Sequence, residues 1–384
     1  MKFYLKISVS VIVILLALLF FVYPAAVITH MLLDSRLRNE GQSSLLPFWF
    51  QSAAGRYSSW ADTYRESNYA VGLDHYDVAP TEWPMFGSAF WLVAADDLHV
   101  QERIDASCGK VRESIDKAAQ IIADPVTGSW VKEKWGESYL ERENVFYRML
   151  IILGLSSYEN ITGNQQYHTL MSEQRESLAK ELEESEFCVK DDYPGECYSS
   201  DVLWSVAAIQ RASRLDNTNH NALVHKLMAN FDGALKSVEG LPAFQVDART
   251  GQLQQGARGC GNSGILSFAA ELDEEVAQRW YQAHVRNFWK DTGWAAGFTE
   301  LPLGSRDSFA DVDSGPVFFE FGSVASAFGI GAARSVGRID HAAPLTMQAV
   351  ACSWPIPFGF LLPGAMGYAA VESWSLGVTD FSSL

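Results

Sequence analysis

Two aspartates in a short polar stretch are the residues of this sequence best suited to acid/base chemistry. Asp311 and Asp313 stand one residue apart, and Ser314, Gly315 and Pro316 follow them. Asp or Ser just before a proline is typical of a helix start, because the side chain caps free N–H groups and proline fits the first turn. An apolar segment follows. We therefore expect a buried helix that opens on paired carboxyl groups, with simple capping as the alternative role of Asp313.

Polar residues precede apolar segments elsewhere in the chain too. If those segments are helices that enter one end of the fold, the residues before them line one cavity. They are Glu82, Trp83, Glu143, Asn144, Tyr147, Tyr198, Asp201, Arg258, Cys260, Asn262 and Glu300.

These residues suggest a division of roles. We predict a catalytic pair in which one member is Asp311 or Asp313. The second member is expected among Glu82, Glu143 and Glu300. Burial raises the pKa of one carboxyl group while a neighbouring charge or hydrogen bond keeps another ionised, which suits a general acid and a general base. Substrate binding is expected of Trp83, Asn144, Tyr147, Tyr198, Asp201, Arg258 and Asn262.

Each of these catalytic or binding roles has a structural alternative. Each acid would serve equally well as a helix cap or as one half of a structural ion pair. Arg258 would either hold an anionic group of a ligand or form a salt bridge to an acid of the cavity.

The elements that would position these residues alternate along the chain. Apolar segments begin near residues 83, 144, 200, 262, 315 and 363, at intervals of 48 to 62 residues. Amphipathic, charged segments lie between them at residues 99–123, 165–186, 219–238, 273–290 and 341–352. With a further helix at residues 44–68, this makes twelve helices. The alternation predicts an all-α (α/α)6 barrel of six helical hairpins, with the apolar set inside.

Strand signals are few. The run from Phe244 to Val246 has strand composition, but no partner lies at hairpin distance, so we do not expect it to pair.

The N-terminal region predicts a membrane anchor. Residues 7–28 form a stretch of 22 uncharged residues, which is long enough to cross a bilayer. Lys2 and Lys6 precede it, so the positive-inside rule places the N-terminus in the cytoplasm and the rest outside. A cleaved signal peptide is the alternative, although the run is long for one and residues 24–26 are a poor cleavage site.

We therefore predict an anchor at residues 1–33 and a barrel domain at residues 34–384. The barrel would lie on the extracytoplasmic or periplasmic side of the cell (inner) membrane, with the lipid bilayer as partner of the N-terminal helix.

Composition excludes one class of partner. The formal charge of −17 argues against nucleic acid, because phosphate binding needs a basic face. The 12 Trp, 14 Tyr and 22 Phe suit both a large core and stacking on sugar rings. No CxxC motif or histidine cluster indicates a metal, and we expect no cofactor.

Two cysteines lie close together in the sequence. Outside the cytoplasm, Cys188 and Cys197 would close a disulfide across their short loop. The total of five leaves at least one cysteine without a partner.

The alternation of apolar and amphipathic helices over about residues 40–384 resembles the six-hairpin (α/α)6-barrel superfamily. A smaller similarity is the segment Ile161-Thr-Gly-Asn164, followed by Tyr167 between paired helices. The recurring activities of that superfamily are glycoside hydrolysis and polysaccharide lysis. The resemblance therefore implies a hydrolase or lyase that acts on a carbohydrate or related polyhydroxylated substrate.

A second resemblance points elsewhere. The segment Cys188-Val-Lys-Asp-Asp-Tyr-Pro-Gly-Glu-Cys197 is similar to the paired-cysteine loop of the linalool dehydratase/isomerase family, which shares the barrel. The stretch from Asn144 to Tyr147 is also similar to that family, but Arg148 and the two residues after it replace the family's histidine. This resemblance implies a lyase for a terpenoid or other alcohol, with Cys188 and Cys197 as active-site thiols. A third alternative is a barrel that binds a glycan or lipid without turnover.

Overall fold

A computed structural model describes residues 2–68, 70–73, 78–306, 310–311, 313–357 and 359–360 of the chain. The chain is mostly helical, with a few strands of two or three residues. The helices are α1 (Lys2–Ala17), the π-helical η1 (Leu18–Val22), α2 (Tyr23–Leu33), α3 (Ser35–Glu40), α4 (Leu46–Glu66), α5 (Val78–Val100), α6 (Gly109–Ala123), α7 (Ser129–Trp135), α8 (Val145–Thr162), α9 (His168–Glu184), α10 (Ser199–Ser213), α11 (Asn221–Phe231), α12 (Gly259–Leu272), α13 (Glu274–Phe288), α14 (Ser323–Ser335) and α15 (Ile339–Ser353).

The strands form four small antiparallel sheets. The largest has the order β1 (Cys197–Tyr198), β2 (Gln245–Val246), β3 (Leu253–Gln255). The other three are hairpins: β4 (Trp289–Asp291) with β5 (Ala296–Phe298), β6 (Val317–Phe318) with β7 (Phe321–Gly322), and β8 (Pro355–Ile356) with β9 (Gly359–Phe360).

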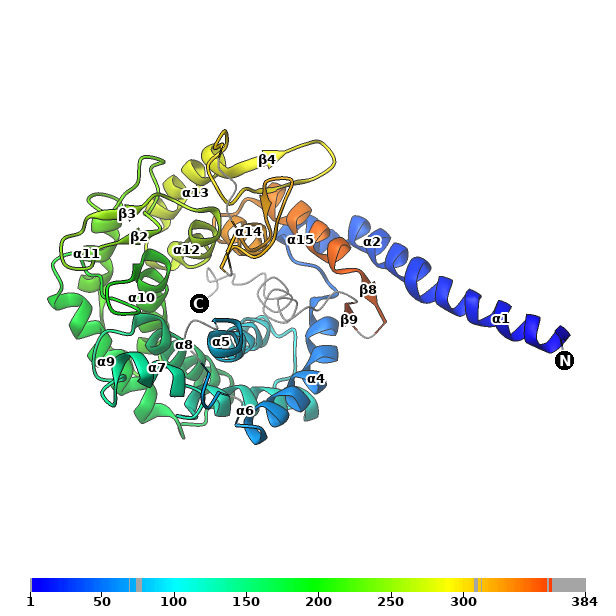
Figure 1. Cartoon of the computed structure of the whole chain (residues 1–384), viewed down its shortest axis with the longest axis horizontal. Helices are drawn as coiled ribbons and strands as arrows, with labels where there is room; N and C mark the ends of the chain where they lie inside the picture. The colour runs from blue at the N-terminus through cyan, green and yellow to red at the C-terminus, as the bar shows by residue number, and fades with distance from the viewer. Residues whose placement is uncertain are drawn as a thin grey trace.

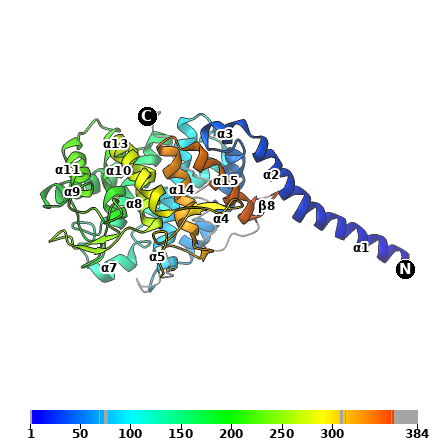
Figure 2. The same ribbon diagram turned by 90° about the horizontal axis from the view of Figure 1, so that it is seen from above.

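The N-terminal helix is long and apolar enough to span a membrane. The candidate span Lys6–Leu33 has 28 residues and is the single such helix in the described part of the chain. Helix α1 projects away from the rest of the molecule, whereas α2 lies beside α15 and β8 (Figures 1 and 2). The predicted N-terminal apolar helix is therefore confirmed as a helix.

Five apolar helices form the inner layer of the molecule. Helices α5, α8, α10, α12 and α14 pack side by side in chain order. The amphipathic helices α6, α9, α11, α13 and α15 lie outside them, each against the inner helix that precedes it (Figure 1). The pattern follows from the residues, because α8 is buried on all sides whereas α6 buries one face.

The inner helices surround a shared aromatic centre, to which each contributes at least one ring. Phe90 of α5 has its ring centroid 5.7 Å from that of Trp204 and 6.1 Å from that of Phe328. The first and fifth inner helices therefore meet through Phe90 and Phe328. The full set is Phe86, Phe90, Phe146, Trp204, Phe268 and Phe328.

The prediction that a helix starts at Asp313 is wrong. The β6–β7 hairpin follows instead, and α14 begins only at Ser323. Phe319 and Glu320 form the hairpin turn with positive φ angles of 52° and 75°, a turn geometry that fits the twist of paired strands. Because Phe318 and Phe319 are exposed, the aromatic run that suggested a buried helix is mostly surface.

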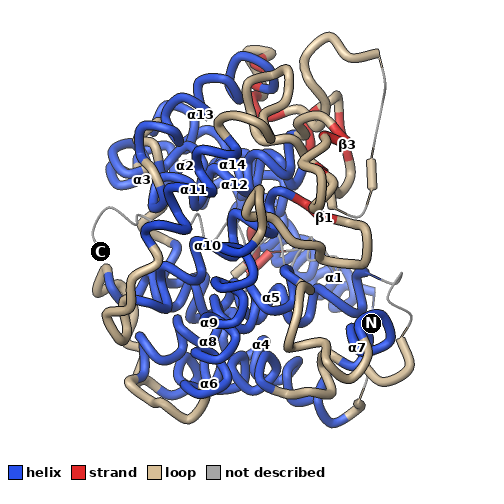
Figure 3. The backbone as a smooth tube through the Cα atoms, turned by 90° about the vertical axis from the view of Figure 1, so that its left-hand side faces the viewer, coloured by secondary structure: helices blue, strands red, loops and turns tan. Residues whose placement is uncertain are grey.

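The expectation for Phe244 to Val246 is also wrong. Gln245 and Val246 pair with β1 on one side and with β3 on the other. The partner β1 lies far away in sequence, but β3 begins after only six intervening residues and so lies at hairpin distance; its sequence Leu-Gln-Gln lacks the composition that marks a strand. Figure 3 places β1 and β3 on the same side of the helices as α7.

The other helices predicted within the described part of the structure are present, but some of them begin or end at residues other than those predicted. The helix predicted at residues 44–68 is α4. The amphipathic helix predicted from residue 99 begins only at Gly109, because α5 continues to Val100 and a loop follows. The sixth apolar segment, from residue 363, lies outside the described residues. The mostly helical fold is confirmed, and the barrel of six hairpins stays a prediction.

Candidate active site

Glu82 lies in the first turns of α5, half-buried. The hydroxyl of Tyr193 donates a hydrogen bond of 2.8 Å to Glu82 Oε1. Burial raises the pKa of Glu82 to about 8, and the charges of Asp313 and Asp201 raise it further against the effect of that hydrogen bond. Glu82 therefore holds its proton at neutral pH, as a general acid must.

Asp201 stands in the first turn of α10 and is 9% exposed. The hydroxyl of Ser200 donates a hydrogen bond of 3.1 Å to Asp201 Oδ1. Burial raises the pKa of Asp201 to about 7, and the charge of Asp313 adds to this effect. Asp201 was expected only to bind substrate, yet its raised pKa makes it a titratable member of the site.

Asp313 lies in the turn before β6, and solvent reaches its side chain. The surrounding protein atoms and the charge of Asp311 raise its pKa to about 6, while Arg258 acts in the opposite direction. Because it is open to solvent, Asp313 is the member that a water molecule or substrate can approach.

Glu82, Asp201 and Asp313 thus come from three separate elements. The charges of Asp201 and Asp313 raise the pKa of Glu82, and the charge of Asp313 raises that of Asp201. We call these three residues the acid cluster. In the described part of the chain, no ion pair joins any of the three to a lysine, arginine or histidine.

Arg258 neutralises two other acids of the predicted catalytic set. Its Nε lies 2.7 Å from Glu300 Oε1, and its Nη1 and Nη2 lie 2.9 and 3.0 Å from the two oxygens of Asp311. The guanidinium also stacks over the ring of Phe244 at 4.2 Å. The structure therefore gives Arg258 the salt-bridge role rather than that of a free ligand contact.

Asp311 is held in its ionised form. Burial by itself favours the neutral acid, but hydrogen bonds from Arg258 and from the backbone N–H of Ser314 keep the pKa of Asp311 below its ordinary value. An acid that is already bonded on both oxygens is a poor proton shuttle. Asp311 therefore positions Arg258 and the turn that carries Asp313.

Glu300 holds the start of α12. Its Oε2 accepts a hydrogen bond of 3.1 Å from the backbone N–H of Cys260, and its backbone carbonyl accepts one of 2.9 Å from Gly259. The Cys260 thiol lies 3.1 Å from Glu300 Oε1. Burial raises the pKa of Glu300, although Arg258 and Cys260 oppose this. At 1% exposure Glu300 is a structural cap rather than a catalytic acid.

The contacts found for Glu143, Asn144 and Tyr147 are with residues outside the acid cluster, and their predicted roles stay predictions. The Asn144 amide donates a hydrogen bond of 2.9 Å to the carbonyl of Tyr139. Tyr147 is 2% exposed and packs edge-on against Trp130 at 6.0 Å. Burial raises the pKa of Glu143, and its charged neighbours are Asp191, Lys190, Glu181 and Arg142.

Three expected contact residues are near the site. Trp83 is half-buried beside Glu82 on α5. The hydroxyl of Tyr198 donates a hydrogen bond of 3.1 Å to Glu196, and burial raises its pKa above the ordinary value. Asn262 is 1% exposed and donates to the carbonyl of Arg258 at 3.2 Å, so it supports the helix start that carries Arg258.

Cys188 and Cys197 are both buried free thiols, so the predicted disulfide is not formed in this structure. Burial raises the pKa of each thiol, and the charges of Asp191 and Asp201 add to this at Cys197. Both groups therefore stay protonated at neutral pH, which does not favour thiolate chemistry.

Sequence reasoning missed Tyr193 and Asp192 in the loop between these cysteines. Asp192 Oδ1 accepts a hydrogen bond of 3.3 Å from the Phe146 N–H, so it caps α8 from a distant loop. Its pKa lies well above the ordinary value because of burial and the nearby Asp201. The Tyr-Pro-Gly-Glu run, a strong turn signal, would have marked where the loop reverses and presents Tyr193.

A second group of charged residues lies at the C-terminal ends of the inner helices. Arg211 of α10 and Glu271 of α12 form an ion pair of 3.1 Å, and Arg214 adds a second at 3.5 Å. Burial raises the pKa of Glu271 to about 7 against these arginines. Asn160 of α8 donates a hydrogen bond of 2.6 Å to Asp96 of α5. We call these five residues the opposite-end network.

The two groups establish the direction of the inner helices. The acid cluster and Arg258 come from helix starts or the loops before them, whereas the opposite-end network comes from helix ends. The inner helices therefore run parallel, which is the arrangement that delivers their leading loops to one place.

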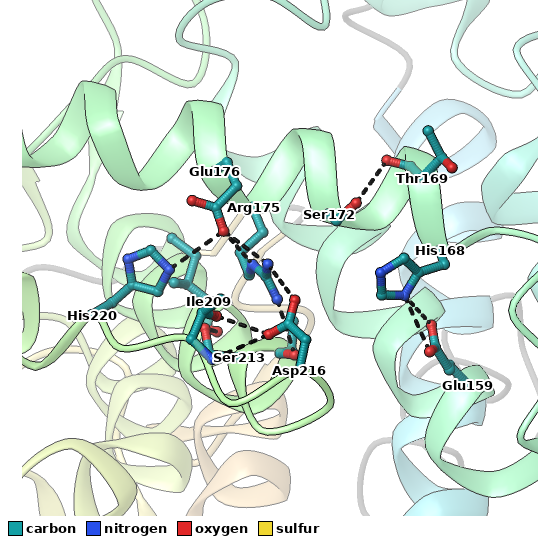
Figure 4. A network of polar contacts seen from close by, with 12 residues as sticks. Glu159, His168, Thr169, Ser172, Arg175, Glu176, Ile209, Ser213, Asp216 and His220 are labelled. Atoms are coloured by element: carbon teal, nitrogen blue, oxygen red, sulfur yellow. Dashed lines mark hydrogen bonds and ion pairs between the residues drawn. The ribbon is translucent and has the colours of Figure 1, made fainter.

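A third polar group ties outer helices to inner ones (Figure 4). Arg175 of α9 pairs with Asp216 at 2.6 Å, and His168 pairs with Glu159 of α8 at 2.9 Å. His220 lies 3.8 Å from Glu176. These contacts connect α9 to its neighbours at the end of the inner helices opposite to the acid cluster. We therefore interpret them as structural.

Comparison with protein families and with curated proteins finds no match to this sequence. Among the described residues, no group of three or more His, Cys, Asp or Glu side chains has the arrangement of a metal site.

Proposed function

We propose that this protein is a membrane-anchored, extracytoplasmic enzyme that uses paired carboxyl groups for acid/base chemistry on a carbohydrate or related polyhydroxylated substrate. The observation that supports this most is the acid cluster, in which the pKa values of Glu82, Asp201 and Asp313 are raised to about 8, 7 and 6. Carboxyl groups with separated pKa values are suited to opposite roles at one pH.

The roles follow from these values. At pH 7 Glu82 is mainly protonated and would donate its proton to a leaving oxygen. Asp313 is mainly ionised and open to solvent, so it would accept a proton from water or from a substrate carbon. Asp201, between the two in pKa, would share the proton and keep the cluster from carrying three charges.

The charge of the site suggests a neutral substrate. Arg258 is already bonded to Glu300 and Asp311, and the acid cluster is joined to no cation in the described residues. A uronate would therefore meet repulsion at this site. We propose hydrolysis of a neutral glycoside ahead of lysis of an acidic polysaccharide, because protonation of the leaving oxygen and activation of water are what the pair can supply.

The same proposal includes a six-hairpin barrel. Five apolar helices with their outer partners are present, and the apolar segment from residue 363 has the composition of a sixth. The thiol-based dehydratase alternative receives less support, because both Cys188 and Cys197 have raised pKa values. A binding protein without turnover is the remaining rival, and turnover distinguishes it.

The test is product formation by the full-length protein in nanodiscs. The probes are neutral oligosaccharides and matched uronate-containing ones, with products identified by mass spectrometry. We expect products from neutral probes, and a loss of kcat of at least about a hundredfold in Asp313→Asn, the scale for losing an acid/base group. Asp105→Asn, on the exposed loop between α5 and α6, is the control and should keep its activity.

Two outcomes would contradict the proposal. Saturable binding of a probe without product would identify a binding protein. Full turnover by Asp313→Asn would remove Asp313 from the mechanism.

A further inference from the structure

The apolar N-terminal stretch divides into two parts that face different surroundings. In α1 and η1, apolar side chains on every side of the helix are about half exposed, from Val11 to Val22. In α2, Val27 and Met31 are 7% and 0% exposed, whereas Leu33 is 71% exposed. Uniform exposure is what a lipid-facing helix shows, and one-sided burial is what a helix packed on a protein shows.

The buried face of α2 has the spacing of a core-facing helix. Four side chains of α2 point inward, at intervals of three, one and three residues: Pro24, Val27, Ile28 and Met31. Helix α2 packs against α15 and β8 (Figure 1). Its exposed residues include Thr29 and His30 beside Leu32 and Leu33, and His30 hydrogen-bonds to Ser44 at 3.1 Å. A face that mixes polar and apolar side chains suits lipid headgroups better than hydrocarbon.

No flexible linker separates α2 from the domain. Asp34 follows α2 directly and caps α3 by accepting a hydrogen bond of 3.0 Å from the N–H of Arg36. Its second carboxylate oxygen accepts one of 2.7 Å from the N–H of Ser44, just before α4. The end of α2 is therefore fixed on the domain.

Trp354 marks the place where the two parts meet. Its indole N–H donates a hydrogen bond of 2.9 Å to the carbonyl of Phe20, and its ring lies edge-on to Phe21 at 6.4 Å. A groove of about 620 Å³ with only apolar side chains runs along this contact, lined by Val13, Leu16, Ala17, Phe20, Phe21 and Trp354. Tryptophan is enriched at the boundary of a bilayer, and an apolar groove beside a spanning helix fits an acyl chain.

We infer that the membrane-spanning segment ends at Val22, with Trp354 at the lipid boundary, and that α2 belongs to the folded domain, which rests directly on the bilayer surface. The uncharged part of α1 and η1, from Ile7 to Val22, has 16 residues and is about 24 Å long. With the Lys6 side chain extended to the headgroups at its far end, it crosses the hydrocarbon core with modest local thinning of the bilayer. The inference rests on the anchor of the proposed function but not on its acid/base chemistry. Because α2 fills part of the core, a cleavage that removed it would damage the domain.

Cysteine accessibility tests the boundary in the full-length protein in nanodiscs. In a Cys108→Ser, Cys352→Ser background, single Ile14→Cys, Ala26→Cys and Thr29→Cys variants are treated with a charged, membrane-impermeant maleimide. We expect Ala26→Cys and Thr29→Cys to react readily, and Ile14→Cys to react at least about a hundredfold more slowly, because charged reagents are excluded from hydrocarbon. All three should react once sodium dodecyl sulfate has dissolved both the bilayer and the fold, after subtraction of the signal that Cys188, Cys197 and Cys260 give in the background without an added cysteine.

Two results would overturn the inference. Protection of Ala26→Cys and Thr29→Cys equal to that of Ile14→Cys would place α2 in the bilayer, and free reaction of all three would mean that no segment spans it. Neither readout depends on turnover, so failure here differs from failure of the proposed chemistry.

A stability comparison on α2 completes the test. Met31→Ala should raise the unfolding equilibrium constant of the domain at least about thirtyfold, as expected for deleting a buried methionine side chain. Leu33→Ala, two residues away on the exposed face, should change it by less than about threefold. Equal, small effects of the two substitutions would show that α2 is not part of the fold and would overturn the inference.

Discussion

The two ends of the inner helices both bury carboxyl groups, but they treat them differently. At the helix starts, the charges of Asp201 and Asp313 raise the pKa of Glu82, and no arginine or lysine is paired with any of the three acids in the described residues. At the helix ends, Glu271 is paired with both Arg211 and Arg214. Burial raises the pKa of Glu82 and Glu271 alike, so burial alone does not distinguish a functional acid from a structural one.

The difference lies in the partners. Glu271 has fixed cationic neighbours, and removing it would take a buried carboxylate away from both Arg211 and Arg214. Glu82 has no cationic partner: burial and the charges of Asp313, Asp201 and Glu196 favour its neutral form, and only the hydrogen bond from the Tyr193 hydroxyl opposes them. An unpaired buried acid destabilises the fold at high pH, and such a cost is commonly kept where a reaction needs it. The same Glu→Gln change should therefore have opposite consequences at the two ends.

The largest expected difference is in catalysis. Glu82→Gln should lower kcat by at least about a hundredfold, because the proton donor is lost. Glu271→Gln should leave the kcat of the folded fraction within about threefold of the wild type. Turnover of neutral oligosaccharides, corrected for the folded fraction by circular dichroism, measures both. Equal losses in the two variants would remove the distinction between the ends.

The next difference is the loss of stability at the helix ends. At pH 8 Glu271→Gln should lower the free energy of unfolding by about 3 kcal/mol, because it removes the buried carboxylate that both Arg211 and Arg214 contact. Urea unfolding of the full-length protein measures this. A neutral or stabilising effect would show that the opposite-end network does not hold the helices together.

A smaller effect of opposite sign is expected at the helix starts. At pH 8 Glu82→Gln should raise the free energy of unfolding by about 1 to 2 kcal/mol, because glutamine carries no charge that burial penalises. Tyr193 can still donate its hydrogen bond to the amide oxygen. Urea unfolding at pH 8 gives the value, and destabilisation here would mean that Glu82 is a structural acid like Glu271.

The smallest expected effect is the change with pH in the stability that Glu82→Gln adds. Between the ordinary pKa of 4.5 and the folded value of about 8, native Glu82 binds more protons than unfolded Glu82, so its contribution to the free energy of unfolding falls as pH rises. The advantage of Glu82→Gln should therefore shrink from pH 8 to pH 5 and vanish near pH 4.5. An advantage that is constant with pH would not come from this titration.

Parts of this arrangement could be predicted from the sequence. Residues 44–68 and the amphipathic segments gave correct helices because their apolar periodicity is local. Glu82, Asp201 and Asp313 were singled out as candidates because each stands near the start of an apolar segment or before it. The error at Asp313 came from competing local signals, since the capping pattern is also compatible with the turn that leads into β6.

Other parts depended on partners that are distant in sequence. Arg258 forms ion pairs with Glu300 and Asp311, which are 42 and 53 residues away. In the segment that contains both aspartates, Asp313 is therefore the one that is not paired with Arg258. Glu143 looked equivalent to Glu82 in sequence, but its neighbours are Asp191 and Lys190. No local pattern reports which acids will meet an arginine.

The sequence by itself determined the apolar N-terminal helix, the alternation of buried and surface helices, and the acidic character of the helix starts, because these follow from composition and period along a single stretch. Only the tertiary structure decided which acids are neutralised, which remain titratable, and where α2 leaves the apolar stretch to join the core. The physical reason is that desolvation and ion pairing depend on what surrounds a side chain in three dimensions, and those neighbours come from loops and helices far apart in the chain.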